Sequence, residues 1–262
     1  MNNQPGEQTR TAWRLPETLS PQWLEAGEAK ALTGATVHVW RASLDLPAAS
    51  PNRCFSLLAA EERERAARFY RDEDRDRFIV ARGTLRILLS RYLNVAPESI
   101  TLNYNSHGKP FLADSSLHFN STRRRELALY AFALRPVGID VELEQATQDF
   151  ESLLPQVATT RERTVLQTLP VVERHQAFLH LWTRKEALLK AVGTGFAFPP
   201  AQFSVLTQPV EMEPDLPPGF DVFRKWTAFV PESGFLATLA TRAGAEVNWF
   251  QFSDDRTCWA GH

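Results

Sequence analysis

The folds open to this chain are limited by the order of its segments, because helical stretches precede strand-like stretches twice along the sequence. In residues 55–95, apolar side chains recur at intervals of three and four, which predicts one buried helical stripe. The stripe consists of Phe78, Ala81, Leu85, Leu88 and Tyr92. This order predicts an α+β fold with antiparallel sheets, and not the alternating strand–helix–strand units of a parallel sheet.

The first cycle follows an N-terminal extension, residues 1–34, in which Trp13, Leu15, Trp23 and Leu24 are apolar enough to pack on the body. A strand is expected at 36–45, and Asp72 or Asp74 marks a break between a short helix and a long one. Further strands are expected at 99–112, around a turn at HGKP, and at 117–121, 127–134 and 137–143.

The second cycle has helices at 149–170 and 172–193, the latter ended by Gly193 and Gly195. Its strands are expected at 201–206, 221–230, 235–241 and 247–252. The chain therefore divides into the extension, an N-terminal half at 35–137 and a C-terminal half at 138–255.

Composition excludes several classes of protein. The net charge of −2 argues against binding of nucleic acid through the overall field. The sequence contains no run of about 18 apolar residues, so we expect no membrane span. The N-terminus is polar and lacks the apolar stretch of a secretory signal. Cys54 and Cys258 lie far apart and outside any CxxC pattern, which predicts reduced thiols and a cytoplasmic location.

Two carboxylates share one face of the strand expected at GIDVE, residues 138–142. Residues two apart on a strand point to the same side, so Asp140 and Glu142 lie together while Ile139 and Val141 face the core. Neighbouring carboxylates repel unless a cation lies between them, and oxygen ligands favour Mg²⁺. Taken alone, the pattern is more typical of a strand with one solvated face than of a metal site.

Other charged residues have simple structural interpretations when each is taken alone. Glu186 and Lys190 are spaced i,i+4 on a helix, as in many surface ion pairs. Arg77, Arg82 and Arg86 border the apolar stripe, where acidic neighbours could pair with them. The run from Arg123 to Arg125, between two apolar strands, indicates either a solvated turn or a bound anion.

The order of these features resembles one family closely. An arginine-rich helix is followed by GKP, by FN with a polar tetrad, by GIDVE and by WTRKEALLKAVGTG. This order is similar to that of the 4′-phosphopantetheinyl transferases of the surfactin-synthetase-activating type, nearest to cyanobacterial members. The resemblance runs from about residue 36 to about residue 250.

The resemblance implies a fold and an activity. Two similar α+β halves would be related by a pseudo-twofold axis, with coenzyme A in the cleft between them. Such enzymes transfer the phosphopantetheine arm of coenzyme A to a serine of an apo carrier protein and release 3′,5′-ADP. By the family pattern Asp140, Glu142 and Glu186 hold Mg²⁺, Glu186 also acts as the base, and Lys190 contacts the pyrophosphate. Asp140, Glu186 and Lys190 are thus the expected catalytic residues.

The same resemblance implies a set of coenzyme A contacts. Residues 107–110 match the segment that lines the adenine pocket, while Arg65 and Arg77 match positions for the 3′-phosphate. Lys185 matches a phosphate contact, and Trp182 a packing position. Glu62 stands where a further lysine is common. The full set of expected contacts is Arg65, Arg77, His107, Gly108, Lys109, Pro110, Asn120, Thr122, Arg123, Arg124, Lys185 and Lys190.

The polar tetrad departs from the family pattern of a hydrophobic residue followed by Ser, His and Ser. Thr122 replaces the serine conservatively, and Arg123 stands in place of the histidine that contacts phosphate. Arginine can bind phosphate through its planar fork, although it is longer than histidine. Arg124 and Arg125 are equally compatible with a solvated turn.

Two alternatives remain open from the sequence. One is a homologue that binds coenzyme A but has weak or lost transfer activity. The other is a nucleic-acid-binding module, against which the acidic residues among the arginines argue. The expected partners are coenzyme A and an apo acyl carrier protein, or the carrier domains of polyketide and peptide synthases, with residues 150–180 part of the docking surface. A monomer is expected.

Overall fold

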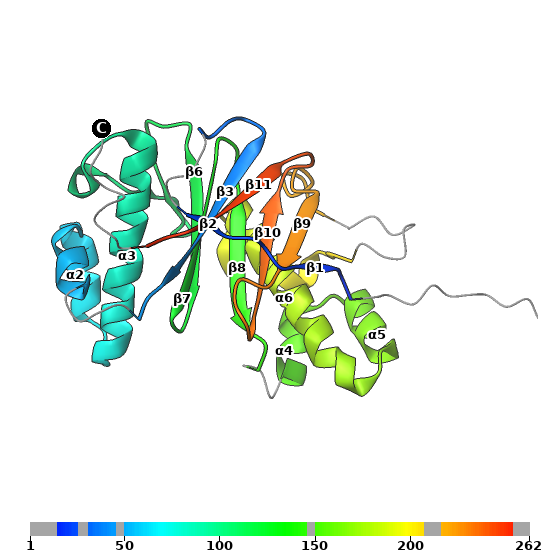
Figure 1. The fold of residues 1–262 in the computed structure, drawn as a ribbon. Coiled ribbons are helices and arrows are strands. Elements are labelled where there is room, and N and C mark those ends of the chain that lie inside the picture. The colour runs from blue at the N-terminus through cyan, green and yellow to red at the C-terminus, as the bar shows by residue number, and fades with distance from the viewer. Residues whose placement is uncertain (1–14, 26–30, 46–49, 146–149, 207–215, 254–262) are drawn as a thin grey trace, which may run out of the picture.

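The protein is organised in four layers, helix, sheet, sheet and helix (Figure 1). The computed structural model describes residues 15–25, 31–45, 50–145, 150–206 and 216–253. Within them the helices and antiparallel-rich sheets confirm the predicted α+β class. No helix in these ranges is both long enough and apolar enough to cross a membrane.

One layer is a five-stranded sheet of order β2-β11-β3-β7-β6. Its strands are β2 (Leu24–Glu25), β11 (Glu246–Gln251), β3 (Thr36–Ser43), β7 (Leu127–Ala133) and β6 (His118–Arg124). The antiparallel pairing of β3, β7 and β6 agrees with the prediction. However, β11 pairs parallel to β3, and β2 pairs parallel to β11, so the sheet is mixed.

The second layer is a four-stranded sheet of order β1-β9-β10-β8. Its strands are β1 (Thr18–Leu19), β9 (Lys225–Phe229), β10 (Phe235–Thr241) and β8 (Gly138–Leu143). Here β9, β10 and β8 are antiparallel, while β1 joins β9 in parallel. A separate hairpin of β4 (Asn103–Tyr104) and β5 (Pro110–Phe111) encloses the predicted HGKP turn.

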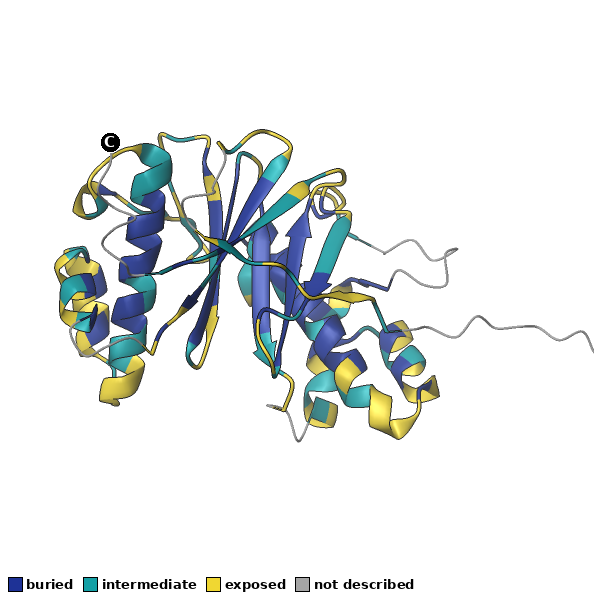
Figure 2. Ribbon diagram, in the orientation of Figure 1, coloured by how far each residue is buried: buried dark blue, intermediate teal, exposed yellow. Residues whose placement is uncertain are grey.

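The apolar core between the two sheets explains the patterning of their strands (Figure 2). Ile139 and Val141 of β8 point into this core, as predicted. β7 is buried along its whole length, because Leu129 faces the same core while Tyr130 and Phe132 face the helical layer on the other side. A strand covered on both faces needs the continuous apolar run LALYAFA rather than an alternating one.

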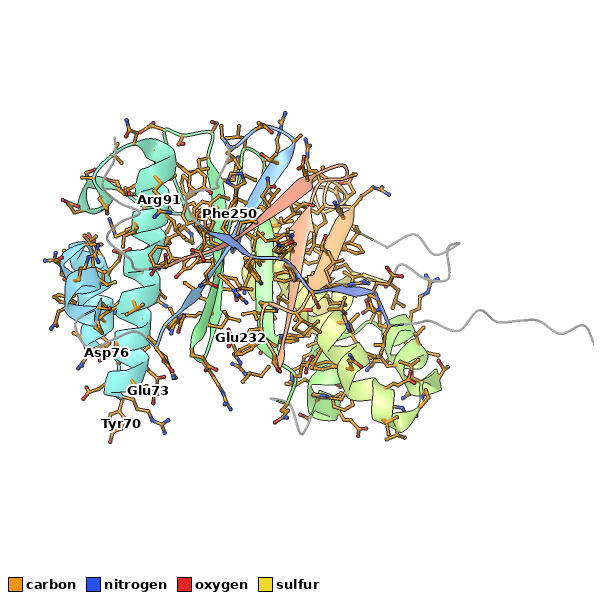
Figure 3. The ribbon with its side chains drawn as sticks, viewed as in Figure 1. Tyr70, Glu73, Asp76, Arg91, Glu232 and Phe250 are labelled. Atoms are coloured by element: carbon orange, nitrogen blue, oxygen red, sulfur yellow. The ribbon has the colours of Figure 1, made fainter. Side chains whose placement is uncertain are left out.

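Helices cover the outer face of each sheet. Beside the five-stranded sheet lie α1 (Ser50–Ser56), α2 (Ala60–Ala67), α3 (Asp72–Leu93) and a 3₁₀ turn at Pro97–Ser99. Beside the four-stranded sheet lie α4 (Phe150–Val157), α5 (Thr160–Thr168), α6 (Val171–Val192) and 3₁₀ turns at Gly195–Ala197 and Pro200–Gln202. The predicted helix break falls at Asp72, where the acidic first turn of α3 complements the helix dipole. Figure 3 shows Glu73 and Asp76 at that end of α3.

The segment at 201–206, expected as a strand, is a 3₁₀ turn followed by irregular chain. Its backbone polar groups are bonded to buried charged side chains instead of to a neighbouring strand. Glu162 accepts from the Val205 N–H at 2.9 Å, and Lys185 donates to the Phe203 carbonyl at 2.7 Å. The apolar character of the segment reflects burial, which a strand and a buried loop share.

The described part of the N-terminal extension runs across both sheets. Leu19 lies in β1 and Leu24 in β2, so one short segment contributes edge strands to two different sheets. Trp23 packs against Phe229 and Trp249, with the Arg41 guanidinium 4.7 Å from its ring centre. Trp13 lies outside the described residues. The division into halves at residue 137 stays a prediction, and the chain ends cross it.

Candidate active site

Asp140 and Glu142 lie on the face of β8 that is turned toward α6, opposite Ile139 and Val141. The strand can approach the helix closely because it begins at a glycine. A Cβ atom on Gly138 would clash with the carbonyl oxygen of Ala187 and the backbone nitrogen of Ala191. The absence of a side chain at this position therefore sets the distance at which the carboxylates meet the helix.

Lys190, on the last turn of α6, binds Asp140 directly. Its Nζ lies 2.5 Å from Asp140 Oδ1 and donates to Thr122 Oγ1 at 3.2 Å. Thr122, from β6, also donates to Asp140 Oδ1 at 3.3 Å. Three separate elements, β6, β8 and α6, thus meet at one buried carboxylate.

Glu142 has a partner at each of its oxygens. The indole Nε1 of Trp182 donates to Oε1 at 3.1 Å, and Arg124 Nε lies 3.0 Å from Oε2. Trp182, expected only to pack, therefore also orients a carboxylate. Arg124 is held by an ion pair, although 44% of its side-chain surface stays in solvent.

Glu186 lies one helical turn before Lys190, among these charges. Burial, with the negative charges of Asp140 and Glu142, raises its pKa to about 7, against the opposing effect of Lys190. Burial and Asp140 also raise the pKa of Glu142, although Arg124 and Trp182 act in the other direction. The pKa of Lys190 is raised because its carboxylate neighbours outweigh the effect of burial. The cluster therefore holds more negative charge than the protein neutralises.

Whether these residues suit a divalent cation can be judged from Asp140. Its side chain is only 5% exposed, and its Oδ2 atom, also buried, accepts no hydrogen bond among the described residues. A buried carboxylate oxygen without a donor is costly unless a cation or water meets it. As the side chains lie in this structure, no three carboxylate, imidazole or thiolate groups in the described ranges are arranged to hold a metal ion. The charge excess and the open oxygen fit an oxygen-liganded cation such as Mg²⁺.

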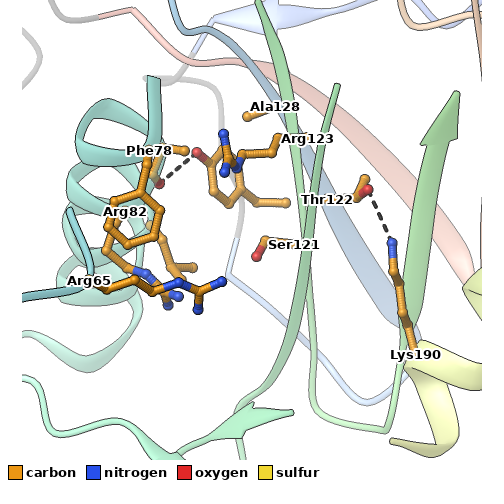
Figure 4. A pocket seen from close by; sticks show the side chains of 11 residues that line it. Arg65, Phe78, Arg82, Ser121, Thr122, Arg123, Ala128 and Lys190 are labelled. Carbon is orange, nitrogen blue, oxygen red and sulfur yellow. Dashed lines mark hydrogen bonds between the residues drawn. The ribbon is translucent and has the colours of Figure 1, made fainter. Parts of the chain in front are cut away.

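A cationic cavity of about 290 Å³ adjoins the carboxylates. Arg65 from α2 and Arg82 from α3 lie on one side of it, and β6 contributes Ser121, Thr122 and Arg123 (Figure 4). Lys190 lines the cavity as well, and its bond to Thr122 is drawn in the same view. Lys190 and Thr122 are therefore shared between the cavity and the carboxylate cluster.

The guanidinium groups of this cavity are incompletely neutralised. Burial lowers the pKa of Arg123, and the positive charges of Arg65 and Arg82 lower it further. Arg82 has a buried Nη1 that donates to no acceptor in the described chain, although its Nε lies 3.4 Å from Glu62 Oε1. Clustered guanidinium groups with unused donors are suited to a phosphate, which accepts several such bonds at once.

Two predicted phosphate contacts are not brought to this cavity. Arg77 is paired with Asp45 at 2.8 Å and with Glu73 at 2.8 Å, and these partners raise its pKa. Lys185 is 1% exposed, and its Nζ is bonded to Glu162 and to three backbone carbonyls. Its ammonium is fully used inside the protein, so the structure gives it a packing role.

The predicted adenine segment lies at the C-terminal end of α6. Lys109 Nζ donates to the Ala191 carbonyl at 2.8 Å, and Asn105 Nδ2 donates to the Gly193 carbonyl at 2.8 Å. Burial lowers the pKa of Lys109 to about 8. His107 and Gly108 are exposed at the tip of this turn, and Pro110 begins β5. Lys109 thus binds a carbonyl at the end of α6. His107 and Gly108, at the exposed tip of the turn, remain accessible to a ligand.

Three further residues singled out in the sequence, Asn120, Arg125 and Glu62, have structural roles. Asn120 accepts the Ile139 N–H at 2.8 Å, which joins the edge strands β6 and β8 of the two sheets. Arg125 has a φ of 49° and forms the turn after β6. Glu62 is buried against Arg86 at 2.6 Å, so the position has become part of the core.

Arg82 was not among the expected contacts, although its place beside the apolar stripe was a signal that it could reach the sheet.

Comparison with known proteins agrees with this geometry. Residues 48–129 match the family model described as 4′-phosphopantetheinyl transferase, N-terminal, and residues 136–216 match that of the 4′-phosphopantetheinyl transferase superfamily. Over 184 residues the chain is 40% identical to the 4′-phosphopantetheinyl transferase HetI of Nostoc sp., an alignment that covers 68% of this chain and 78% of that protein. The chain belongs to the 4′-phosphopantetheinyl transferase superfamily.

A second relative in this superfamily is the transferase Sfp of Bacillus subtilis, 31% identical over 173 residues, or 63% of this chain and 74% of that protein. The two transferase family models divide the site between them. Arg65, Arg82 and the β6 residues fall in the first matched region. Asp140, Glu142, Glu186 and Lys190 fall in the second.

Proposed function

We propose that this protein transfers the 4′-phosphopantetheine group of coenzyme A to a serine of an apo carrier protein and releases 3′,5′-ADP. One observation supports this most strongly: Lys190 and Thr122 belong both to the guanidinium cavity and to the carboxylate cluster. A phosphate-binding cavity and a basic carboxylate must adjoin if a hydroxyl is to attack phosphorus at a bound pyrophosphate. The named relatives, which are phosphopantetheinyl transferases, support the same activity.

Each group of residues has a task in this reaction. Arg65, Arg82 and Arg123 line the cavity and bind phosphate oxygens of coenzyme A there, and the buried Nη1 of Arg82 supplies an unused donor. Lys190 lies at the junction and stabilises the charge that grows on the departing phosphate. Arg123 performs the phosphate contact that a histidine performs in the family pattern. The contacts expected at residues 107–110 stay predictions.

Glu186 is the proposed base. In the metal-free protein its pKa of about 7 makes this carboxyl group a better proton acceptor than an ordinary glutamate. The serine oxygen forms a bond to phosphorus, and the bond from that phosphorus to the leaving ADP oxygen breaks. The serine proton passes to Glu186, so charge and atoms balance.

We further propose that Asp140, Glu142 and Glu186 hold Mg²⁺, since their excess negative charge and the open Oδ2 of Asp140 suit such an ion. When bound, Mg²⁺ neutralises the pyrophosphate charge during the transfer. Asp140 and Lys190 orient each other through their ion pair. A cytoplasmic location, a monomer and an acyl carrier protein or carrier domain as partner stay predictions from the sequence.

The intact mass of a purified apo carrier protein tests the proposed function. Incubation with this protein, coenzyme A and Mg²⁺ should add one phosphopantetheine, and Glu186→Gln should reduce the rate by about 10²–10⁴-fold. Glu173→Gln, exposed on the same helix, is the matched control and should leave the rate unchanged. No gain of mass on fatty-acid, polyketide or peptide carriers, with coenzyme A still bound, would identify a binding homologue without transfer.

A further inference from the structure

We propose that Arg124 is an internal counter-cation of the carboxylate cluster, which pairs with Glu142 in the free protein and gives way to a divalent cation. The metal affinity of the site would then depend on how strongly Arg124 competes for Glu142. This inference rests on the proposed function only in assuming that the carboxylates bind a metal ion. It assigns a role to a residue that departs from the family pattern.

The occupancy of the carboxylate oxygens leads to this inference. Asp140 Oδ1 is taken by Lys190, and Glu142 Oε1 by Trp182. Asp140 Oδ2 is open, whereas Glu142 Oε2 is held by Arg124 at 3.0 Å. A divalent cation that binds Asp140 and Glu142 together therefore meets a guanidinium group already on the second carboxylate. Two cations beside one carboxylate repel each other, so the ion and Arg124 compete.

Among the described partners of these two carboxylates, Arg124 is the one placed to leave. Its side chain is 44% exposed, against 28% for Lys190, and it ends a strand beside the turn at Arg125. Lys190 and Trp182 both project from the packed helix α6. The pair is open to solvent on the side of Arg124, while Glu142 is only 20% exposed. Ion pairs that reach solvent contribute little to stability and are weakened by salt. Displacement of Arg124 therefore costs the fold little.

The neighbouring arginines do not share this role. Residues two apart on a strand face the same side, so Thr122 and Arg124 both reach β8. Arg123 points the other way, where its guanidinium lies 5.9 Å from the ring centre of Phe69 and 5.8 Å from that of Phe78. Arg125 lies in the turn. One run of three arginines thus serves a cavity, a carboxylate and a turn.

Direct Mn²⁺ titration, followed by the electron paramagnetic resonance of the free ion, tests the inference without any transfer reaction. Arg124→Gln should bind Mn²⁺ about two- to fivefold more tightly than the wild type at low salt, the range expected for loss of an exposed ion pair. Arg125→Gln removes the same charge from the next residue, in the turn after β6, and should leave the affinity unchanged. The gain at Arg124 should shrink as salt rises to about 0.5 M, because screening weakens the competing pair.

Three results would overturn the inference. They are an unchanged or weaker Mn²⁺ affinity in Arg124→Gln, an equal gain in Arg125→Gln, and weaker coenzyme A binding by Arg124→Gln in metal-free buffer. The last would make Arg124 a phosphate contact. Thermal unfolding of both variants confirms that the fold is retained. The carrier mass assay on the wild type is independent, so failure of the proposed function and failure of this inference give different results.

Discussion

Glu186 is a carboxyl group placed where ionisation is unfavourable. Burial and two neighbouring carboxylates raise its pKa to about 7, and Lys190 only partly offsets them. The same property that makes Glu186 a suitable base also makes its charged form destabilising to the folded protein. The functional role and the cost in stability thus have one physical origin.

This cost predicts a pH dependence of stability. Because the folded-state pKa lies above the ordinary 4.5, the folded protein retains a proton at Glu186 that the unfolded chain releases between about pH 4.5 and about pH 7. The contribution of this group to stability therefore falls as pH rises through that window. Glu186→Gln removes the effect, so its free energy of unfolding should exceed that of the wild type by more at about pH 8 than at about pH 5.

Urea unfolding of both proteins in chelated buffer measures this difference, with Glu173→Gln as a control that should follow the wild type at both pH values. A difference that stays constant or shrinks toward high pH would show that Glu186 is not destabilised by its surroundings.

At the scale of elements, α6 is held by a buried ammonium that the sequence suggested was a phosphate contact. Lys185 is bonded to Glu162 at 2.6 Å and to the carbonyls of Val157, Pro200 and Phe203. Lys185→Met should lower the free energy of unfolding by about 3–5 kcal/mol, because Glu162 stays buried without its cation. Lys225→Met, which removes a half-buried lysine with one carbonyl partner, should cost about 1 kcal/mol.

Chemical denaturation distinguishes the two roles of Lys185. Equal stability losses in the two methionine variants, together with weaker coenzyme A binding by Lys185→Met alone, would contradict the structural role. They would show that Lys185 contacts a phosphate of coenzyme A.

The approach of β8 to α6 gives a second prediction at this scale. Gly138→Ala places a Cβ against the backbone of Ala187 and Ala191, which cannot move without shifting the helix. We expect a loss of about 3 kcal/mol or more in the free energy of unfolding, the upper range for overpacking. Gly34→Ala meets nothing within 4 Å and is the control. Thermal unfolding of the two variants checks this, and near-equal midpoints would contradict the close approach.

The spacing of apolar residues along the sequence was enough to predict most helices and strands of this fold. The partners of individual side chains and the pairing of distant strands depend on tertiary contacts, which this spacing does not reveal. The alternation in GIDVE correctly predicted which side of β8 carries Asp140, because strand geometry alone sets it. The choice between Arg77 and Arg82 could not be predicted, since both border the same apolar stripe. Only tertiary packing places Asp45 beside Arg77 and β6 beside Arg82. The parallel pairing of β11 with β3 likewise joins segments about 200 residues apart.

At the scale of the whole molecule, the chain ends tie the two sheets together. β11 leaves the C-terminal half to pair with β3, and the segment from Leu19 to Leu24 touches both sheets. We therefore expect the protein to unfold in one transition despite the predicted division into two halves. Tryptophan fluorescence and far-ultraviolet circular dichroism should give coincident curves in urea. Two separated transitions would show that each half is stable alone.

The central claim is that the cavity shared by Arg123 and Lys190 is the site of coenzyme A. Calorimetric titration of coenzyme A into the wild type, Arg123→Gln and Arg77→Gln tests it most directly. Loss of a charge-assisted contact should weaken binding by Arg123→Gln about ten- to a hundredfold. Arg77→Gln should bind as the wild type does, because Arg77 is paired with Asp45 and Glu73. Weaker binding by Arg77→Gln, with Arg123→Gln unaffected, would contradict the account and place the cofactor elsewhere.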